Sequence, residues 1–134
     1  MRIVLDTNCL IQSISPRSRY YSVWESLVDG RNTLCVSNEI IMEYLEILQR
    51  LTDYDTAETI IKTLVNSRFV EFITPFYHFE LISQDPDDNK FVDCAIAASA
   101  RYIVTNDHHF DVLKSVSYPP IDVIKLEEFI KLLQ

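Results

Sequence analysis

The stretch Arg2-Ile3-Val4-Leu5-Asp6-Thr7-Asn8 begins with an apolar run and ends in three polar residues. An apolar run of this length is typical of a short buried strand, and the polar residues mark its carboxyl end. The same order of features returns at Tyr102-Ile103-Val104-Thr105-Asn106-Asp107. Both stretches therefore predict a strand with an aspartate soon after its end.

Strand-like and helix-like segments alternate along the rest of the chain. Further strands are predicted at residues 33–36, 69–73 and 121–124. Helices are predicted at residues 7–14 and 19–29, after Ser37 to about 51, after Asp53 or Asp55 to about 67, at about 89–100, shortly after Asp107, and at 126–133. Gly30 is expected to end the second helix, and residues 76–88 are expected to be irregular.

This alternation predicts the fold class. Strands that alternate with helices form mainly parallel sheets covered by helices on both faces. We therefore expect a single α/β domain over residues 1–134, with three α/β/α layers and a central sheet of about five strands.

Composition restricts the function classes. Gly30 is the single glycine, which argues against Gly-rich phosphate loops of the Rossmann or P-loop type. The three cysteines are far apart and each lies in an apolar stretch, so we expect reduced, buried thiols and a cytoplasmic location. No apolar run approaches membrane-spanning length, and no membrane partner is expected.

The net charge of −8 argues against a nucleic-acid binder, because phosphate contacts usually need a basic surface. Bound divalent cations reverse that argument, since they change the sign of the local field. The positions of the acidic residues therefore decide whether the chain could bind nucleic acid through metal ions.

Two aspartates are expected at one edge of the sheet. Asp6 and Asp107 both follow predicted strands, and ligands of parallel α/β folds bind beyond the carboxyl ends of the strands. Either residue could instead be a helix N-cap, a role that aspartate fills well.

The other acidic candidates lie on or beside predicted helices. Asp93 stands in an apolar, small-residue helix, where a buried carboxylate is unfavourable unless it is paired or binds a cation. Glu43 belongs to a polar stripe with Glu39 and Glu46, and periodicity alone does not select it. Asp87 and Asp88 are expected turn formers or helix caps, and it stays open whether either joins the site.

Carboxylates that converge repel one another unless a cation lies between them. Hard divalent cations such as Mg²⁺ or Mn²⁺ prefer carboxylate oxygen and water as ligands. Carboxylate-held metal is also the usual apparatus for hydrolysing phosphodiester bonds, because it activates a bound water and stabilises the leaving oxygen.

Four blocks of the sequence resemble the PIN-domain nucleases. They are residues 3–10 with the Asp-Thr-Asn triplet, residues 37–45 with Glu43, residues 85–95 with Asp93, and residues 102–107 with Asp107. The resemblance implies a PIN-like fold and an endonuclease that cuts RNA with Mg²⁺ or Mn²⁺. It is strongest to the stand-alone prokaryotic members, many of which are VapC-type toxins of toxin–antitoxin pairs.

The resemblance also implies roles for individual residues. Asp6 and Asp93 would be the main metal ligands, and Glu43 and Asp107 would complete the catalytic, metal-binding group. Asn8 and Thr105 would orient the carboxylates. The implied partners are the RNA substrate, an antitoxin protein and a second copy of the chain in a homodimer. The alternative is a catalytically weak PIN-fold binding module that acts through RNA or a protein partner.

Overall fold

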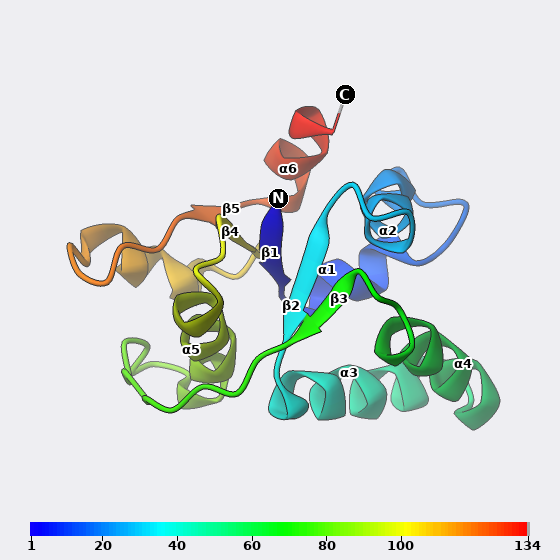
Figure 1. Ribbon diagram of the computed structural model, residues 1–134, viewed down its shortest axis with the longest axis horizontal. Helices are drawn as coiled ribbons and strands as arrows, with labels where there is room; N and C mark the ends of the chain where they lie inside the picture. The colour runs from blue at the N-terminus through cyan, green and yellow to red at the C-terminus, as the bar shows by residue number, and fades with distance from the viewer. Residues whose placement is uncertain (134) are drawn as a thin grey trace.

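A computed structural model describes residues 1–133; Gln134, the last residue of the predicted domain, lies outside the described residues. The strands are β1 (Arg2–Leu5), β2 (Thr33–Val36), β3 (Val70–Phe72), β4 (Tyr102–Val104) and β5 (Val123–Ile124). They form one sheet in the order β3-β2-β1-β4-β5, and every pair of neighbours is parallel. The predicted α/β fold with a parallel central sheet is confirmed (Figure 1).

The helices are α1 (Thr7–Ser13), α2 (Tyr21–Val28), α3 (Asn38–Leu51), α4 (Tyr54–Val65), α5 (Asn89–Ala98) and α6 (Leu126–Leu132), with 3₁₀ helices η1 (Pro86–Asp88) and η2 (His108–Ser115). Their order is the predicted one. The third and fifth strands are shorter than predicted, because flanking residues such as Phe69 and Ile121 lie outside the hydrogen-bonded ladder.

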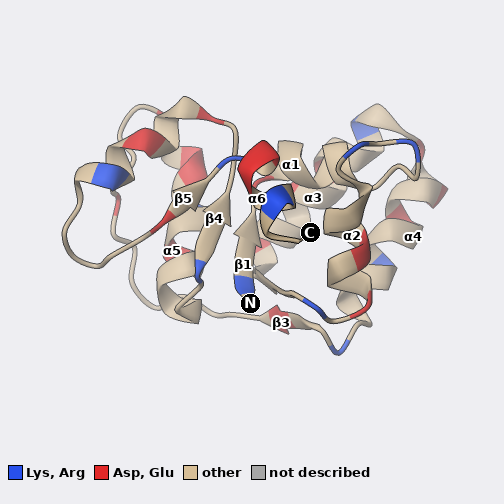
Figure 2. Cartoon of the chain, turned by 90° about the horizontal axis from the view of Figure 1, so that it is seen from above, with Lys and Arg blue, Asp and Glu red and all other residues tan. Residues whose placement is uncertain are grey.

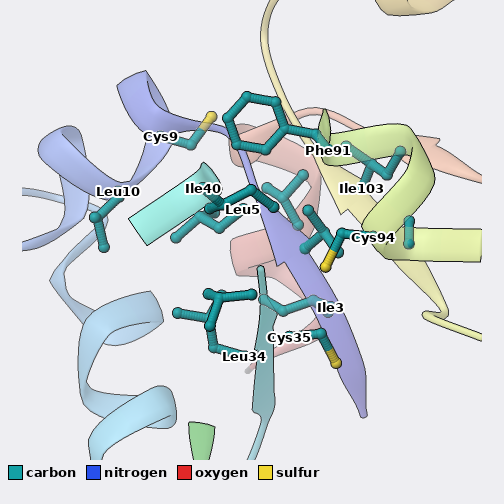
Figure 3. Packing of buried hydrophobic residues seen from close by; sticks show 14 of the residues in the cluster. Ile3, Leu5, Cys9, Leu10, Leu34, Cys35, Ile40, Phe91, Cys94 and Ile103 are labelled. Carbon is teal, nitrogen blue, oxygen red and sulfur yellow. The ribbon is translucent and has the colours of Figure 1, made fainter. Parts of the chain in front are cut away.

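The core lies on both faces of β1, whose residues Ile3, Val4 and Leu5 are fully buried. Figure 3 shows Ile40 of α3 on one side of this strand and Cys94 of α5 on the other. Helices cover both faces of the central strands, so apolar residues fill most of their positions, whereas the edge strand β3 carries the exposed Glu71. This explains why the central strands read as continuous apolar runs.

The order of the strands creates a crevice at one edge of the sheet. The chain runs from β1 outward through β2 and β3, then returns to place β4 on the other side of β1. The connections that leave β1 and β4 therefore diverge at their carboxyl ends, which is where parallel α/β folds bind ligands. The amide of Asp6 donates to the carbonyl of Val104 at 3.0 Å and extends the β1–β4 pairing into this crevice.

Local signals in the sequence set the element boundaries. The Ser37 hydroxyl caps α3 by accepting the amide of Ile40, and Asp53, rather than Asp55, caps α4. Gly30 has φ +84°, and an added Cβ would lie 2.6 Å from the Phe69 ring. Glycine is thus required there both for the backbone conformation and for the packing of Phe69.

The three cysteines are free and buried. Burial raises the pKa of Cys9 and of Cys94 to about 12. None of the helices in residues 1–133 is both long enough and apolar enough to cross a membrane.

The end of α5 yields a prediction about stability. Ser99 follows this helix with φ +51°, in the left-handed region, and Ala100 donates to the carbonyl of Ala95. Ser99→Gly should relieve the strain of the side chain and raise the free energy of unfolding by about 0.5–1 kcal/mol. The same substitution inside α2, Ser22→Gly, should lower it by about 0.5 kcal/mol. Urea unfolding of both variants checks the opposite signs; a loss of stability in Ser99→Gly would contradict the prediction.

Candidate active site

Asp6 directly follows β1 at the carboxyl edge of the sheet and is 7% exposed. Its Oδ1 accepts the amide of Thr7 at 2.8 Å, and its Oδ2 accepts the hydroxyl of Thr105 at 2.7 Å. Burial raises the pKa of Asp6, the two hydrogen bonds oppose that rise, and the charges of Glu43 and Asp107 add to it. Asp6 is therefore a buried carboxylate held among other carboxylates.

Glu43 reaches the same place from α3. The hydroxyl of Thr7 donates to Glu43 Oε2, and the Nζ of Lys90 lies 2.7 Å from Oε1. The Lys90 side chain is only 9% exposed and also lies 3.3 Å from Asp87. Burial by itself would lower the pKa of Lys90, but its contacts with Glu43 and Asp87 raise the pKa overall. Lys90 thus stays positively charged beside Glu43.

Asp107 is joined to Asp6 through Thr105. The Thr105 hydroxyl, which donates to Asp6, accepts the amide of Asp107 at 3.0 Å. The carboxylate of Asp107 accepts the amide of His109 at 2.9 Å and caps η2. Asp107 is therefore both a helix cap and a member of the acidic group.

Asp88 is the fourth acid near these residues. Its side chain is 15% exposed, and its Oδ2 is fully covered without a hydrogen-bond partner among the described residues. Burial raises the pKa of Asp88 to about 7, helped by the charges of Asp85, Asp6, Asp107 and Glu43. Asp88 therefore lies within electrostatic reach of the other three acids.

Asp93 contacts the segment that follows β3, and its role as a metal ligand stays a prediction. It is 4% exposed, accepts the amide of Phe79 at 3.1 Å, and lies 3.3 Å from His78 Nδ1. A helix turns about 100° per residue, so five residues carry Asp93 about 140° away from Asp88. The Asp93 carboxylate therefore has two polar contacts with the segment that follows β3.

Asp93 instead lines a neighbouring cavity of about 540 Å³, between α5 and the segment that follows β3. Ser37, Glu39, His78, Asp87 and Lys90 also line it. Because Lys90 contacts Glu43 as well, this cavity adjoins the acidic group.

The basic residues are scattered over the chain, as Figure 2 shows. Several basic residues form ion pairs away from the acidic group: Arg19 with Glu127, Arg31 with Asp29, Arg101 with Asp122, and Lys114 with Asp111. Lys90 is the basic side chain that contacts the acidic group. Asn8 is exposed in the first turn of α1, and the group is organised by Thr7 and Thr105.

Asp6, Glu43, Asp88 and Asp107 thus lie within electrostatic reach of one another near the carboxyl edge of the sheet. One lysine does not balance four carboxylates in a partly buried crevice, and Asp88 Oδ2 is left without a partner. Oxygen donors with this surplus of negative charge fit a hard divalent cation. The sequence does not predict a role for Thr7, because its hydrogen bond to Glu43 depends on where α3 lies in the fold.

The family model of the PIN domain matches residues 2–109. The chain belongs to the PIN-domain family. PIN domains are nucleases, so at the family level the chain is a hydrolase that acts on nucleic acids. No curated protein gives a significant match to the sequence.

Solved structures share the PIN fold. VapBC2 from Rickettsia felis, bound to a DNA fragment from the promoter, has 20% identity and a TM-score of 0.65, with 93% of this chain and 98% of that chain covered. VapBC-1 from nontypeable Haemophilus influenzae has 16% identity and a TM-score of 0.64, with 95% and 99% covered. The PIN domain endonuclease Utp24 has 14% identity and a TM-score of 0.56, with 92% and 84% covered.

The raised pKa of Asp88 predicts how stability depends on pH. Asp88 binds its proton more tightly in the folded chain, so its contribution to the free energy of unfolding is lost as pH rises from its ordinary pKa of 3.8 to about 7. Without metal, Asp88→Asn should therefore be stabilising at pH 8, by about 2 kcal/mol more than at pH 5.

Urea unfolding in EDTA at both pH values measures this difference. Asp87→Asn is the matched control, because the Asp87 side chain is 83% exposed and should leave the pH dependence unchanged. An equal effect of Asp88→Asn at pH 5 and pH 8 would show that Asp88 does not titrate in this range.

Proposed function

We propose that this PIN-domain protein is a metal-dependent endoribonuclease and the toxin of a toxin–antitoxin pair. The observation that carries the proposal is the partnerless, buried oxygen of Asp88, within electrostatic reach of Asp6, Glu43 and Asp107. A carboxylate oxygen in that position is unfavourable in the protein alone and becomes favourable with a cation.

Asp6, Glu43, Asp88 and Asp107 would hold Mg²⁺ or Mn²⁺. The metal would supply an activated water for attack on the phosphodiester and would stabilise the charge on the leaving oxygen. The hydroxyls of Thr7 and Thr105 hold Glu43 and Asp6 in fixed orientations before metal binds. In this proposal Asp88 takes the role that the sequence assigned to Asp93.

Lys90 has a separate role in this proposal. Its ammonium holds Glu43 in place and offers positive charge at the border of the neighbouring cavity. A phosphate of the RNA next to the cleaved one would be attracted there. This helps to offset the net charge of −8, which otherwise opposes binding of a polyanion.

The partners remain part of the proposal. Two of the similar structures are VapBC proteins, which supports an antitoxin as partner. The homodimer and the cytoplasmic location come from the same resemblance. The alternative is a catalytically weak binding module, and it would need no metal in the crevice.

RNA cleavage tests the function. We expect the purified protein to cut mixed structured RNAs in Mg²⁺ or Mn²⁺ and not in EDTA. Asp6→Asn and Asp88→Asn should each lower the cleavage rate by about 100-fold or more, because each removes a charged metal ligand. Asp93→Asn, the matched control, should retain at least about a tenth of the activity, because Asp93 contacts His78 and Phe79 rather than the acidic group.

Thermal unfolding in the same solutions separates the alternatives. Mg²⁺ or Mn²⁺ should raise the melting temperature of the wild type, and should do so much less for Asp6→Asn. Metal-independent melting together with absent cleavage would favour the binding module. Loss of cleavage in Asp93→Asn but not in Asp88→Asn would return the metal-binding role to Asp93.

A further inference from the structure

Two buried polar atoms near the proposed active site have no hydrogen-bond partners among the described residues. They are Oδ2 of Asp88 and Nδ1 of His109, and 4.0 Å separates them. This distance is too long for a hydrogen bond. Buried polar atoms normally have a partner. A carboxylate oxygen and an imidazole nitrogen at this spacing could both bind one cation.

A third ligand atom lies close to this pair. Oxygen of Asp85 and the ligand atoms of Asp88 and His109 all lie within 4.8 Å of one another. All three residues are half-buried. Two of the three ligand atoms are carboxylate oxygens that lie within 4.8 Å of each other. The two carboxylates therefore repel each other in the metal-free protein, and a cation would remove that repulsion.

The spacing suits one shared ion. Ligand atoms that each lie about 2.1 Å from an ion are separated by about 3.0 Å at a right angle and about 4.2 Å when opposite each other. The 4.0 Å between Asp88 and His109 falls within this range. Small side-chain movements would bring Asp85 to the same ion.

The kind of ligand decides the kind of cation. Mg²⁺ takes oxygen ligands and keeps several of its waters, whereas imidazole nitrogen suits first-row transition metals. We propose that Asp85, Asp88 and His109 form a second divalent-cation site that binds Mn²⁺ or a similar transition metal in preference to Mg²⁺. The inference rests on the proposed function, because Asp88 also belongs to the acidic group.

The site would connect the two ends of the crevice. Asp88 immediately precedes α5, whereas His109 lies in η2, two residues after Asp107. His109 also donates its amide to Asp107 at 2.9 Å. An ion held by Asp85, Asp88 and His109 would fix η1 against η2 and would partly neutralise Asp88. The carboxylates of the acidic group would then repel one another less.

The competing explanation is a protonated His109. An imidazolium would form ion pairs with Asp88 at 4.0 Å and with Asp107 at 3.4 Å and would need no metal. That arrangement has no preference between Mn²⁺ and Mg²⁺ and puts no nitrogen on a bound metal. Direct metal–nitrogen bonding therefore separates the two explanations.

Electron paramagnetic resonance of Mn²⁺ provides the test. The signal of free Mn²⁺ measures affinity during titration of metal-free protein, with and without excess Mg²⁺. Spin-echo modulation of the bound ion detects nitrogen that is directly coordinated to it. We expect a nitrogen coupling in the wild type, and we expect His109→Gln to remove it and to weaken Mn²⁺ binding about tenfold in excess Mg²⁺.

Two variants make the outcome decisive. His78→Gln is the same substitution at another histidine that contacts a carboxylate, Asp93, and should change neither measurement. Asp6→Asn tests the proposed active site. If Asp6→Asn weakens metal binding while the wild type shows no nitrogen coupling, the proposed function stands and the second site is refuted. If the wild type binds neither Mn²⁺ nor Mg²⁺, both proposals are overturned.

Discussion

The hydrogen bond from the Thr105 hydroxyl to Asp6 joins two strand ends that are 99 residues apart in the sequence. It exists because β4 returns to pair with β1, so that the ends of the two strands face the same crevice. The same hydroxyl accepts the amide of Asp107. One threonine thus orients the Asp6 carboxylate and holds the backbone at Asp107, and α3 and the start of α5 contribute the rest of the acidic group.

The acidic group is electrostatically unfavourable in the metal-free protein. Two hydrogen bonds hold the Asp6 carboxylate in place. Burial and the negative charges of four neighbouring carboxylates oppose the ionisation of Asp88. Lys90 offsets part of this charge at Glu43. Functional sites often concentrate unfavourable electrostatics of this kind, and the surrounding core sustains them. Here that core comprises both faces of β1, whose residues Ile3, Val4 and Leu5 are fully buried.

The sequence predicts the fold well because the central strands are mostly apolar runs and several helices have a clear start or stop signal, such as Ser37, Asp53 or Gly30. Asp6 and Asp107 could be placed because their strands end immediately before or shortly before them. Asp88 and Asp93 could not be separated in this way. Asp93 lies in α5 and Asp88 directly precedes it. Which of the two carboxylates points toward Asp6 depends on its angular position around the axis of α5. The sequence also could not show that Lys90 pairs with Glu43, because the two residues lie on different helices. Nor could it show that His78 and Phe79 contact the Asp93 carboxylate.

The three buried thiols have a practical consequence. Cys9 and Cys94, with pKa values near 12, hold almost no thiolate at neutral pH, and their sulfur atoms lie in the core beside β1 (Figure 3). Alkylating reagents can therefore reach them only when the sheet opens. The native cysteines therefore report on opening of the core. The rate of their chemical labelling measures how often the core opens, without an added probe.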